Sequence, residues 1–474
     1  MITSMGKYEK LAKNSLFVFI GNIGSRAIGF IMLPFYTSWL SVEQYGTVDL
    51  VTVYVSLLLP FISFSLSSAI FAIPVGHKKE EQGQYFTIGL VFVLASIVVS
   101  SLLIVGIGSL NIIEDEVFNK YTVYICIMLL TSFLQTYIQQ FCMAIDKMFV
   151  FSCTGIVLAA TTAIGGFILI PNQGIEGYLK AIIVANVITI LFTAIIMKAY
   201  EYIILKSFNT TLLKEMLKYS IPMIPNKLLW WIIASFNRVT MNQYIGVYYL
   251  GLYAIASKLP SIISSMINPL SNSWKLSVVQ EYKNEDFNKY YSNISQAIVM
   301  IVSLGVMILG ILSELIIGII TDTEYHVSWI YSPILLLSVV FVTLDQMVAP
   351  IFMAYRKTKY FLYASLCGAI IGVILNFVLI PFIGIWGAVI SMVGSHAILS
   401  LVQLKMSWRF EKNKSIWRII FFIIITIICN SILSVYKNYI IAVIIFVFSI
   451  GLFFYYNWNQ MNQLIALIQK KRKK

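Results

Sequence analysis

The chain has 474 residues, of which 59% are hydrophobic and only 11% are charged. Soluble globular proteins carry about 25% charged residues, so this composition excludes an ordinary soluble domain and indicates a polytopic membrane protein. The formal net charge of +13 would suit nucleic acid, but its distribution along the chain does not.

Fourteen apolar segments are long enough to cross a membrane as helices. The first follows Lys7, Lys10 and Lys13 as a signal peptide would, but it is too long and no small-residue cleavage site follows it. We therefore expect an uncleaved first span. The predicted spans are about 15–36, 49–71, 85–108, 121–142, 149–170, 178–198, 221–244, 251–271, 294–316, 329–352, 361–380, 386–405, 417–436 and 439–458.

The basic residues separate by side of the membrane. Of the 33, alternate connections starting from the N-terminus hold 26, and four more lie within spans. The other side holds only Lys120, Lys180 and Lys437. The positive-inside rule therefore predicts that both termini are cytoplasmic. The C-terminal "KKRKK" (470–474) is expected to contact anionic lipid headgroups, and no nucleic-acid partner is expected.

No feature indicates a metal, a cofactor or a catalytic residue. The five cysteines lack disulfide or metal-ligand spacing and are expected to be free thiols. The acidic cluster Glu114, Asp115 and Glu116 is interpreted as a solvated loop.

Two parts of the chain repeat each other. "FILIPNQGIEG" (167–177) matches "FVLIPFIGIWG" (377–387), and "MAIDK" (143–147) matches "MAYRK" (353–357), both at an offset of 210 residues. "YGTVDLVTVYVSLL" (45–58) matches "LGLYAIASKLPSII" (250–263) more loosely, at an offset of 205. Six spans per copy keep the copies in the same orientation, as in parallel-repeat transporters. We expect an N-lobe at 1–206, a C-lobe at 207–412, and two further helices with a basic tail at 413–474.

The two six-helix lobes, and above all "LPFYTSWLSVEQYGTVDL" (33–50), resemble the MOP exporter superfamily, in particular its polysaccharide-repeat, O-antigen (Wzx-type) flippases. The two extra spans resemble the arrangement of lipid II flippases. The resemblance implies a non-enzymatic flippase of the bacterial inner membrane that moves undecaprenyl-diphosphate-linked oligosaccharide by alternating access. Expected partners are this substrate and membrane lipids. An H⁺ or Na⁺ coupling ion and the polysaccharide polymerase and chain-length machinery are further candidates.

Charged residues within spans are expensive in lipid and usually face a water-filled cavity or a partner. Arg26 shares a helical face with Asn22 and Gly29, while Gly21, Ser25 and Gly29 form a ladder of small residues. Arg26 is a candidate anion-binding residue in the transport path. The alternative is a structural arginine paired with a carboxylate, for which Asp49 is the nearest candidate.

A second cationic face lies in the seventh span. Lys227, Trp231 and Arg238 share one helical face, which would suit a sugar diphosphate, with charge for the phosphates and an aromatic plane for the sugars. The alternative is snorkelling of the two cations towards the helix ends.

Polar stripes at helical spacing follow spans two and eight. They carry the candidate substrate-binding residues Ser56, Ser63, Lys258, Ser261 and Asn268. The alternative reading is hydrogen bonding between helices without transport.

Asp345 is the only carboxylate deep inside a span, and either couples transport to H⁺ or Na⁺ or pairs with a cation. Asp49 is a second coupling candidate, or a residue at the membrane interface.

Two other functions remain open. A cation-coupled multidrug exporter of the same superfamily should carry acidic residues in its cavity, whereas this chain places four cations within spans. A membrane polysaccharide polymerase or glycosyltransferase should carry a sizeable extramembrane loop, and the longest external connection here is about a dozen residues (109–120).

Overall fold

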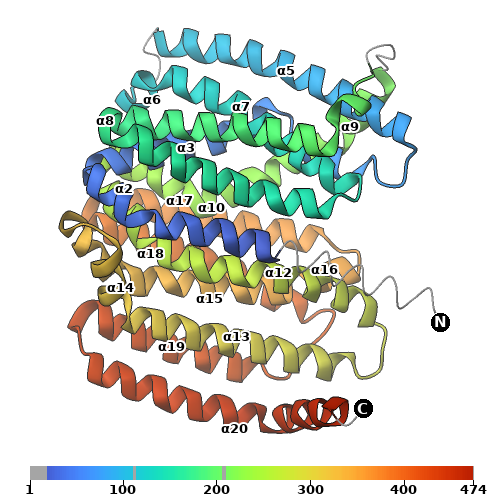
Figure 1. The fold of residues 1–474 in the computed structure, drawn as a ribbon. Helices are drawn as coiled ribbons and strands as arrows, with labels where there is room; N and C mark the ends of the chain where they lie inside the picture. The colour runs from blue at the N-terminus through green and yellow to red at the C-terminus, as the bar shows by residue number, and fades with distance from the viewer. Residues whose placement is uncertain (1–18, 110–113, 205–209, 473–474) are drawn as a thin grey trace. The chain divides into compact units, whose positions relative to one another are not determined.

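A computed structural model describes residues 19–109, 114–204 and 210–472. Within these ranges every regular element is a helix and there is no strand (Figure 1). The all-α polytopic class is thereby confirmed. Lys7, Lys10, Lys13 and the side chains of "KKRKK" lie outside the described part of the chain.

The chain forms two compact units. Unit 1 comprises Met1–Ala254 together with Ile320–Tyr325, and unit 2 comprises Ile255–Ile319 together with His326–Lys474. The helices of unit 1 are a segment at 19–31, α2 (Leu33–Trp39), α3 (Val42–Ile62), α4 (Leu66–Ala72), α5 (Lys79–Ser109), α6 (Glu116–Lys120), α7 (Thr122–Ala144), α8 (Met148–Met197), η1 (Ala199–Tyr202), α9 (Thr210–Ser220), η2 (Ile221–Met223), α10 (Ile224–Ile245) and most of α11 (Val247–Ala256).

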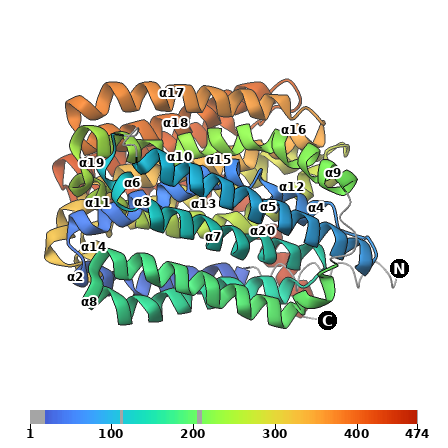
Figure 2. The ribbon, with the colours of Figure 1, turned by 90° about the horizontal axis from the view of Figure 1, so that it is seen from above.

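Unit 2 contains the remaining helices, and within it α17 and α18 lie side by side (Figure 2). Its elements are α12 (Lys258–Glu281), α13 (Phe287–Ile311), α14 (Ser313–Ile320), most of η3 (Thr323–Tyr331), α15 (Ser332–Val348), α16 (Pro350–Ala354), α17 (Lys359–Ile383), α18 (Ile385–Ser407), α19 (Ile416–Tyr436) and α20 (Tyr439–Arg472). The expected division into lobes at 206 and 412 remains a prediction.

Ten helices among the described residues are long and apolar enough to cross a membrane, or eleven if the bent pair α11 and α12 forms one span. The predicted spans 149–170 and 178–198 correspond to the two parts of α8, which are separated by non-helical angles at Gly174. The two parts fold back on each other, since a Cβ on Gly165 would lie 3.3 Å from Ala181 Cβ and one on Gly177 would lie 2.3 Å from Leu169 O. The predicted span 221–244 corresponds to the more polar α10, and the first predicted span begins outside the described residues.

The predicted second span, 49–71, is broken, so the expectation of one continuous helix is wrong. A capping box of Ser41 and Gln44 starts α3. The helix stops at Ile62, where Ser63 donates both its amide and its hydroxyl to Leu59 O. Phe64 and Ser65 then take positive φ values of 48° and 53°, which start α4 in a new direction.

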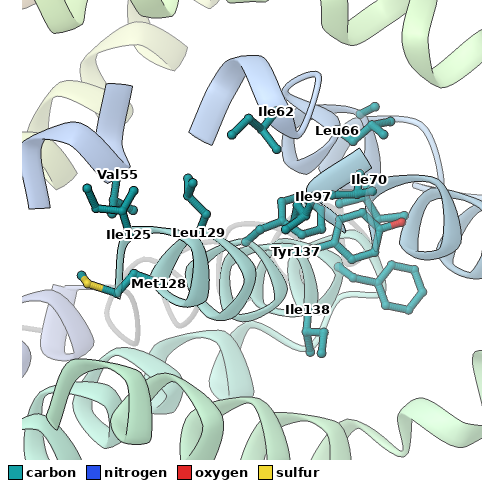
Figure 3. Close-up of a cluster of buried hydrophobic side chains, with 14 of the residues drawn as sticks. Val55, Ile62, Leu66, Ile70, Ile97, Ile125, Met128, Leu129, Tyr137 and Ile138 are labelled. Atoms are coloured by element: carbon teal, nitrogen blue, oxygen red, sulfur yellow. The ribbon is translucent and has the colours of Figure 1, made fainter. Parts of the chain in front are cut away.

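A large apolar cluster joins several described helices of unit 1. Tyr137, Leu129 and Ile125 on α7 are fully buried and contact side chains from α3, α4 and α5, including Val55, Leu66 and Ile97 (Figure 3). Burying a side chain of this size stabilises a soluble fold by about 1.5–3 kcal/mol. Within the membrane the gain comes from close packing instead, because lipid is as apolar as the side chains.

The two helices beyond the predicted repeat, α19 and α20, pack against α13 in unit 2 (Figure 1). Met307, Cys429 and Ala442 join the three helices in a second apolar cluster. The buried Asn430 donates from Nδ2 to Pro333 O at 2.9 Å, which ties α19 to α15 as well. All five cysteines are free thiols, as expected.

The backbone confirms the repeat at the offset of 210. Gly174 has φ 53° and ψ −126°, and its counterpart Gly384 has φ 57° and ψ −130°. Asp146 and Arg356, also equivalent, take φ values of 63° and 55°. Non-glycine residues rarely adopt positive φ, so the agreement at Asp146 and Arg356 supports the equivalence of the two copies.

Replacing Gly384 with alanine should destabilise the protein by about 1–3 kcal/mol, because an L-residue is strained at these angles. A Cβ at this position would meet nothing within 4 Å, so the effect would report backbone strain alone. Unfolding of the purified protein in detergent measures it. Gly305→Ala is the matched control, since it also meets nothing within 4 Å but has no positive φ. It should be neutral or stabilising by up to about 1 kcal/mol; equal behaviour of the two variants would contradict this account.

Candidate functional site

The helical segment 19–31 packs on α8 through small residues. A Cβ on Gly21 would lie 2.8 Å from Ser152 O, and one on Gly24 would lie 3.3 Å from Ile156 Cγ1. Glycine therefore permits the backbones to approach. The predicted small-residue ladder is confirmed at Gly21 but is wrong at Gly29, which has nothing within 4 Å of a Cβ.

Arg26 lies on another face of this segment, and that face is open. Arg26, Asn22 and Gly29 are all exposed. No hydrogen bond or ion pair joins Arg26 to another side chain in the described part of the chain. The predicted alternative partner, Asp49, is bound to a different arginine. Among the described residues, Arg26 thus has no carboxylate partner, although it lies within a predicted span.

That other arginine is Arg238 on α10. Its Nε donates to Asp49 Oδ2 at 2.8 Å, and its NH1 donates to Ala234 O at 3.0 Å. The guanidinium also lies 5.2 Å from the ring centroid of Tyr253. The two charged side chains are only 14% and 19% exposed. A carboxylate, a carbonyl and an aromatic face together compensate this partly buried charge.

The remaining polar residues of the predicted α10 face also have partners in unit 1. Lys227 Nζ donates to Ser68 Oγ at 2.9 Å, and Trp231 Nε1 donates to Ser56 Oγ at 3.1 Å. With Arg238 and Asn242 these residues follow helical spacing, so a single α10 face binds α3, α4 and the start of α6. We call Lys227, Trp231, Arg238 and Asn242 with their partners the α10 polar seam.

Asp115 is a member of this seam that the sequence did not reveal. Its Oδ2 accepts from Tyr54 OH at 2.6 Å and from Asn242 Nδ2 at 2.7 Å, while its Oδ1 caps α6 by accepting from Phe118 N at 2.7 Å. The interpretation of Asp115 as a solvated loop residue is therefore wrong. An aspartate before a short helix is a capping signal, but its distant partners have no sequence signature.

Only some residues of the predicted polar stripes are exposed. Ser56 and Asn268 are exposed, Ser261 and Lys258 are half-buried, and Ser63 is buried. The hydroxyls of Ser63 and Ser261 donate to their own helices, at Leu59 O and Lys258 O. Asn268 on α12 accepts from Gln346 Nε2 at 3.1 Å in unit 2.

Asp345 is a buried acid in unit 2. It is 4% exposed on α15, and its Oδ1 has no hydrogen-bond partner. Gln403 on α18 and Lys275 on α12 lie near enough to act on its charge. His396 is also buried, with its ring Nδ1 3.0 Å from Met392 O. No group of three or more metal-ligating side chains occurs among the described residues.

The fold defines the class of protein. The lipid II flippase MurJ, in an inward closed conformation, matches with a TM-score of 0.74 and 15% identity over 95% of this chain and all of that chain. A mutant of the MATE transporter VcmN from Vibrio cholerae matches with a TM-score of 0.60 and 13% identity, over 86% of this chain and 98% of that one. A MOP superfamily transporter from Pyrococcus furiosus matches with a TM-score of 0.60 and 16% identity, over 84% and 95%. The protein has the fold of the MOP superfamily.

Its family is more specific. The profile described as "Polysaccharide biosynthesis protein" matches residues 11–274, and the MatE profile matches residues 222–378. The first match covers more than half of the chain, so the chain belongs to the polysaccharide biosynthesis protein family. Comparison with curated protein sequences found no significant match.

The ion pair between Arg238 and Asp49 should be measurably coupled. Replacing either residue with alanine leaves a partly buried charge unpaired, so each single variant should unfold more easily than the wild type. The double variant should lose less stability than the sum of the two, by about 1–3 kcal/mol. A double-mutant cycle on unfolding in detergent gives this number, and additive losses would show that the pair is not coupled.

Proposed function

We propose that this protein is a flippase that carries undecaprenyl-diphosphate-linked oligosaccharide repeat units across the bacterial cytoplasmic membrane, with both termini in the cytoplasm. The observation that carries the proposal is Arg26, an exposed arginine without a partner in the described structure and within a predicted span. A lipid-facing charge at the centre of a helix costs at least about 2.5–3.5 kcal/mol. An aqueous path for an anionic cargo would remove that cost, and Arg26 would bind the cargo there. Membership of the polysaccharide biosynthesis protein family supports the same class of cargo.

The α10 polar seam would bind the cargo in a second step of transport, after Arg26. Arg238 is bound to Asp49 in the present state, and a diphosphate offers the same kind of oxygen ligands as a carboxylate. Cargo phosphate would replace Asp49 on Arg238, while Trp231, released from Ser56, would stack on a sugar. Lys227 has a hydroxyl partner but no carboxylate partner, so it would add positive charge on the cytoplasmic half of the same face. Lys258, Ser261 and Asn268 on α12 are further candidate residues for binding the cargo.

No bond in the cargo is made or broken in this proposal, so no catalytic residue or cofactor is assigned. Multidrug export by the same fold is the second candidate. The balance of charge within predicted spans favours an anionic cargo, because the four cations Arg26, Lys227, Arg238 and Lys258 stand against Asp345 and Asp49, of which Asp49 is bound to Arg238. The polysaccharide polymerase and chain-length machinery would act on the delivered repeat units.

Replacing Arg26 with alanine should strongly weaken rescue of a deletion strain. Cells without the gene should accumulate lipid-linked repeat units in the inner leaflet and lose surface polysaccharide, and the wild-type gene should restore both. A charged hydrogen bond contributes about 1.5–3 kcal/mol, so Arg26→Ala should lower export about tenfold or more. Arg26→Lys should retain part of it.

The matched control is Lys180→Ala, which removes an exposed cation already paired with Glu176. It should rescue fully. Equal rescue by Arg26→Ala would remove Arg26 from the path. Intact polysaccharide in the deletion strain would reject the flippase, and altered drug susceptibility would then favour the multidrug exporter.

We propose that Asp345 couples transport to H⁺ or Na⁺. Its buried carboxylate has an oxygen without a hydrogen bond, so a bound proton or cation would stabilise it. Asp345→Asn should continue to flip cargo in membrane vesicles but lose its response to an imposed pH or sodium gradient. If Asp345 is instead a structural partner of Lys275, the variant should be unstable, and adding Lys275→Ala should restore its stability without any change in coupling.

A further inference from the structure

Two glycines at equivalent positions of the repeat contact each other's helices in unit 1. Gly46 on α3 and Gly251 on α11 correspond at the offset of 205 residues, and so do Val42 and Val247. A Cβ on Gly46 would lie 2.1 Å from Val247 O, and a Cβ on Gly251 would lie 2.0 Å from Val42 O. Each helix therefore presents a glycine to the carbonyl four residues before the glycine of the other helix.

This reciprocal contact leaves no room for any side chain. Real Cβ atoms do not approach other heavy atoms closer than 3.0 Å, and the obstacle here is backbone that cannot rotate away. Backbones this close form Cα–H···O contacts, as in membrane helix pairs joined through small residues. Glycine inside a helix is otherwise unfavourable by about 1 kcal/mol, so both positions retain a residue that helix propensity disfavours.

Further contacts close the same end of unit 1. The segment Ile320–Tyr325 covers it, since Tyr325 OH donates to Leu40 O at 2.8 Å and Asp322 N donates to Thr37 Oγ1 at 3.1 Å. The ring of Tyr325 meets that of Tyr45 edge-on. The ion pair of Asp49 lies one helical turn beyond Gly46. By the charge distribution this end of α3 faces away from the cytoplasm.

We propose that the contact between Gly46 and Gly251 is the external gate of the transport path, closed in this state and separated in the outward-open state. The inference rests on the proposed alternating-access function and names the surface that seals one side of it. Because the two glycines are equivalent in the repeat, each lobe contributes the same half of the seal. The α10 polar seam opens with it, which couples release of Arg238 from Asp49 to opening of the gate.

Chemical labelling of a cysteine from outside the cell tests the gate without any cargo. Its result is therefore independent of the flippase assay. With the five native cysteines replaced, Ser56→Cys on α3 reports from about 15 Å below Gly46. A membrane-impermeant maleimide is added to intact cells. Gly46→Ala and Gly251→Ala should each speed labelling about tenfold or more, since a clash that disfavours the closed state by about 1.4 kcal/mol shifts the equilibrium tenfold.

Gly305→Ala is the control, because its Cβ meets nothing within 4 Å. It should label at the wild-type rate. If the folded gate variants, judged by size-exclusion chromatography, label no faster than this control, the proposal is overturned.

A second measurement tests the gate even if Gly46→Ala and Gly251→Ala do not fold. With the five native cysteines replaced and both glycines intact, spin labels at Glu43→Cys and Tyr249→Cys, both exposed beside the contact, report the separation of α3 and α11. With undecaprenyl diphosphate as the probe ligand, we expect a second, longer distance to become populated. One short distance under all conditions would identify a fixed pivot and overturn the gate.

Discussion

The arrangement of unit 1 depends on how charge is compensated where water is scarce. Arg238 cannot lose its proton, so the fold must provide it with an anion. Asp49 supplies that anion, with Ala234 O and Tyr253 as further partners. Meeting this requirement brings α10 against α3 along its length, because the neighbouring polar residues of the same face then find hydroxyl and carboxylate partners. The seam thus combines one ion pair with hydrogen bonds from Lys227, Trp231 and Asn242.

Close approach of backbones is the second requirement, and it explains where glycine is used. Gly21 allows the backbone of Ser152 to approach closely, and Gly46 and Gly251 each allow the helix of the other to do so. In lipid, apolar side chains gain little by leaving their surroundings, so association depends on contact distance and polar bonds. The glycine contact and the Arg238 pair lie one turn apart on α3, and each makes the other easier to form.

The sequence predicted those features that are periodic. Helical spacing placed Lys227, Trp231 and Arg238 on one face, and the repeat predicted matched positions at Gly174 and Gly384, whose unusual angles agree. It did not predict which helix that face meets, because periodicity defines a direction but not a neighbour. The break after Ile62 was also missed, since Phe64 and Ser65 are not residues that signal positive φ. The role of Asp115 depends on Tyr54 and Asn242, which are 61 and 127 residues away.

The contrast between the two arginines indicates an order of events. Arg26 is exposed and has no partner in the described structure, whereas Arg238 is held by Asp49. In the proposed path an anion would meet available charge at Arg26 first. It would reach Arg238 only by displacing a carboxylate, and that displacement would loosen the seam between α10 and α3. A ligand shifts a conformational equilibrium only through its different affinity for the two states. Here the difference has a structural origin, because in the present state the second binding group is already occupied by the protein itself.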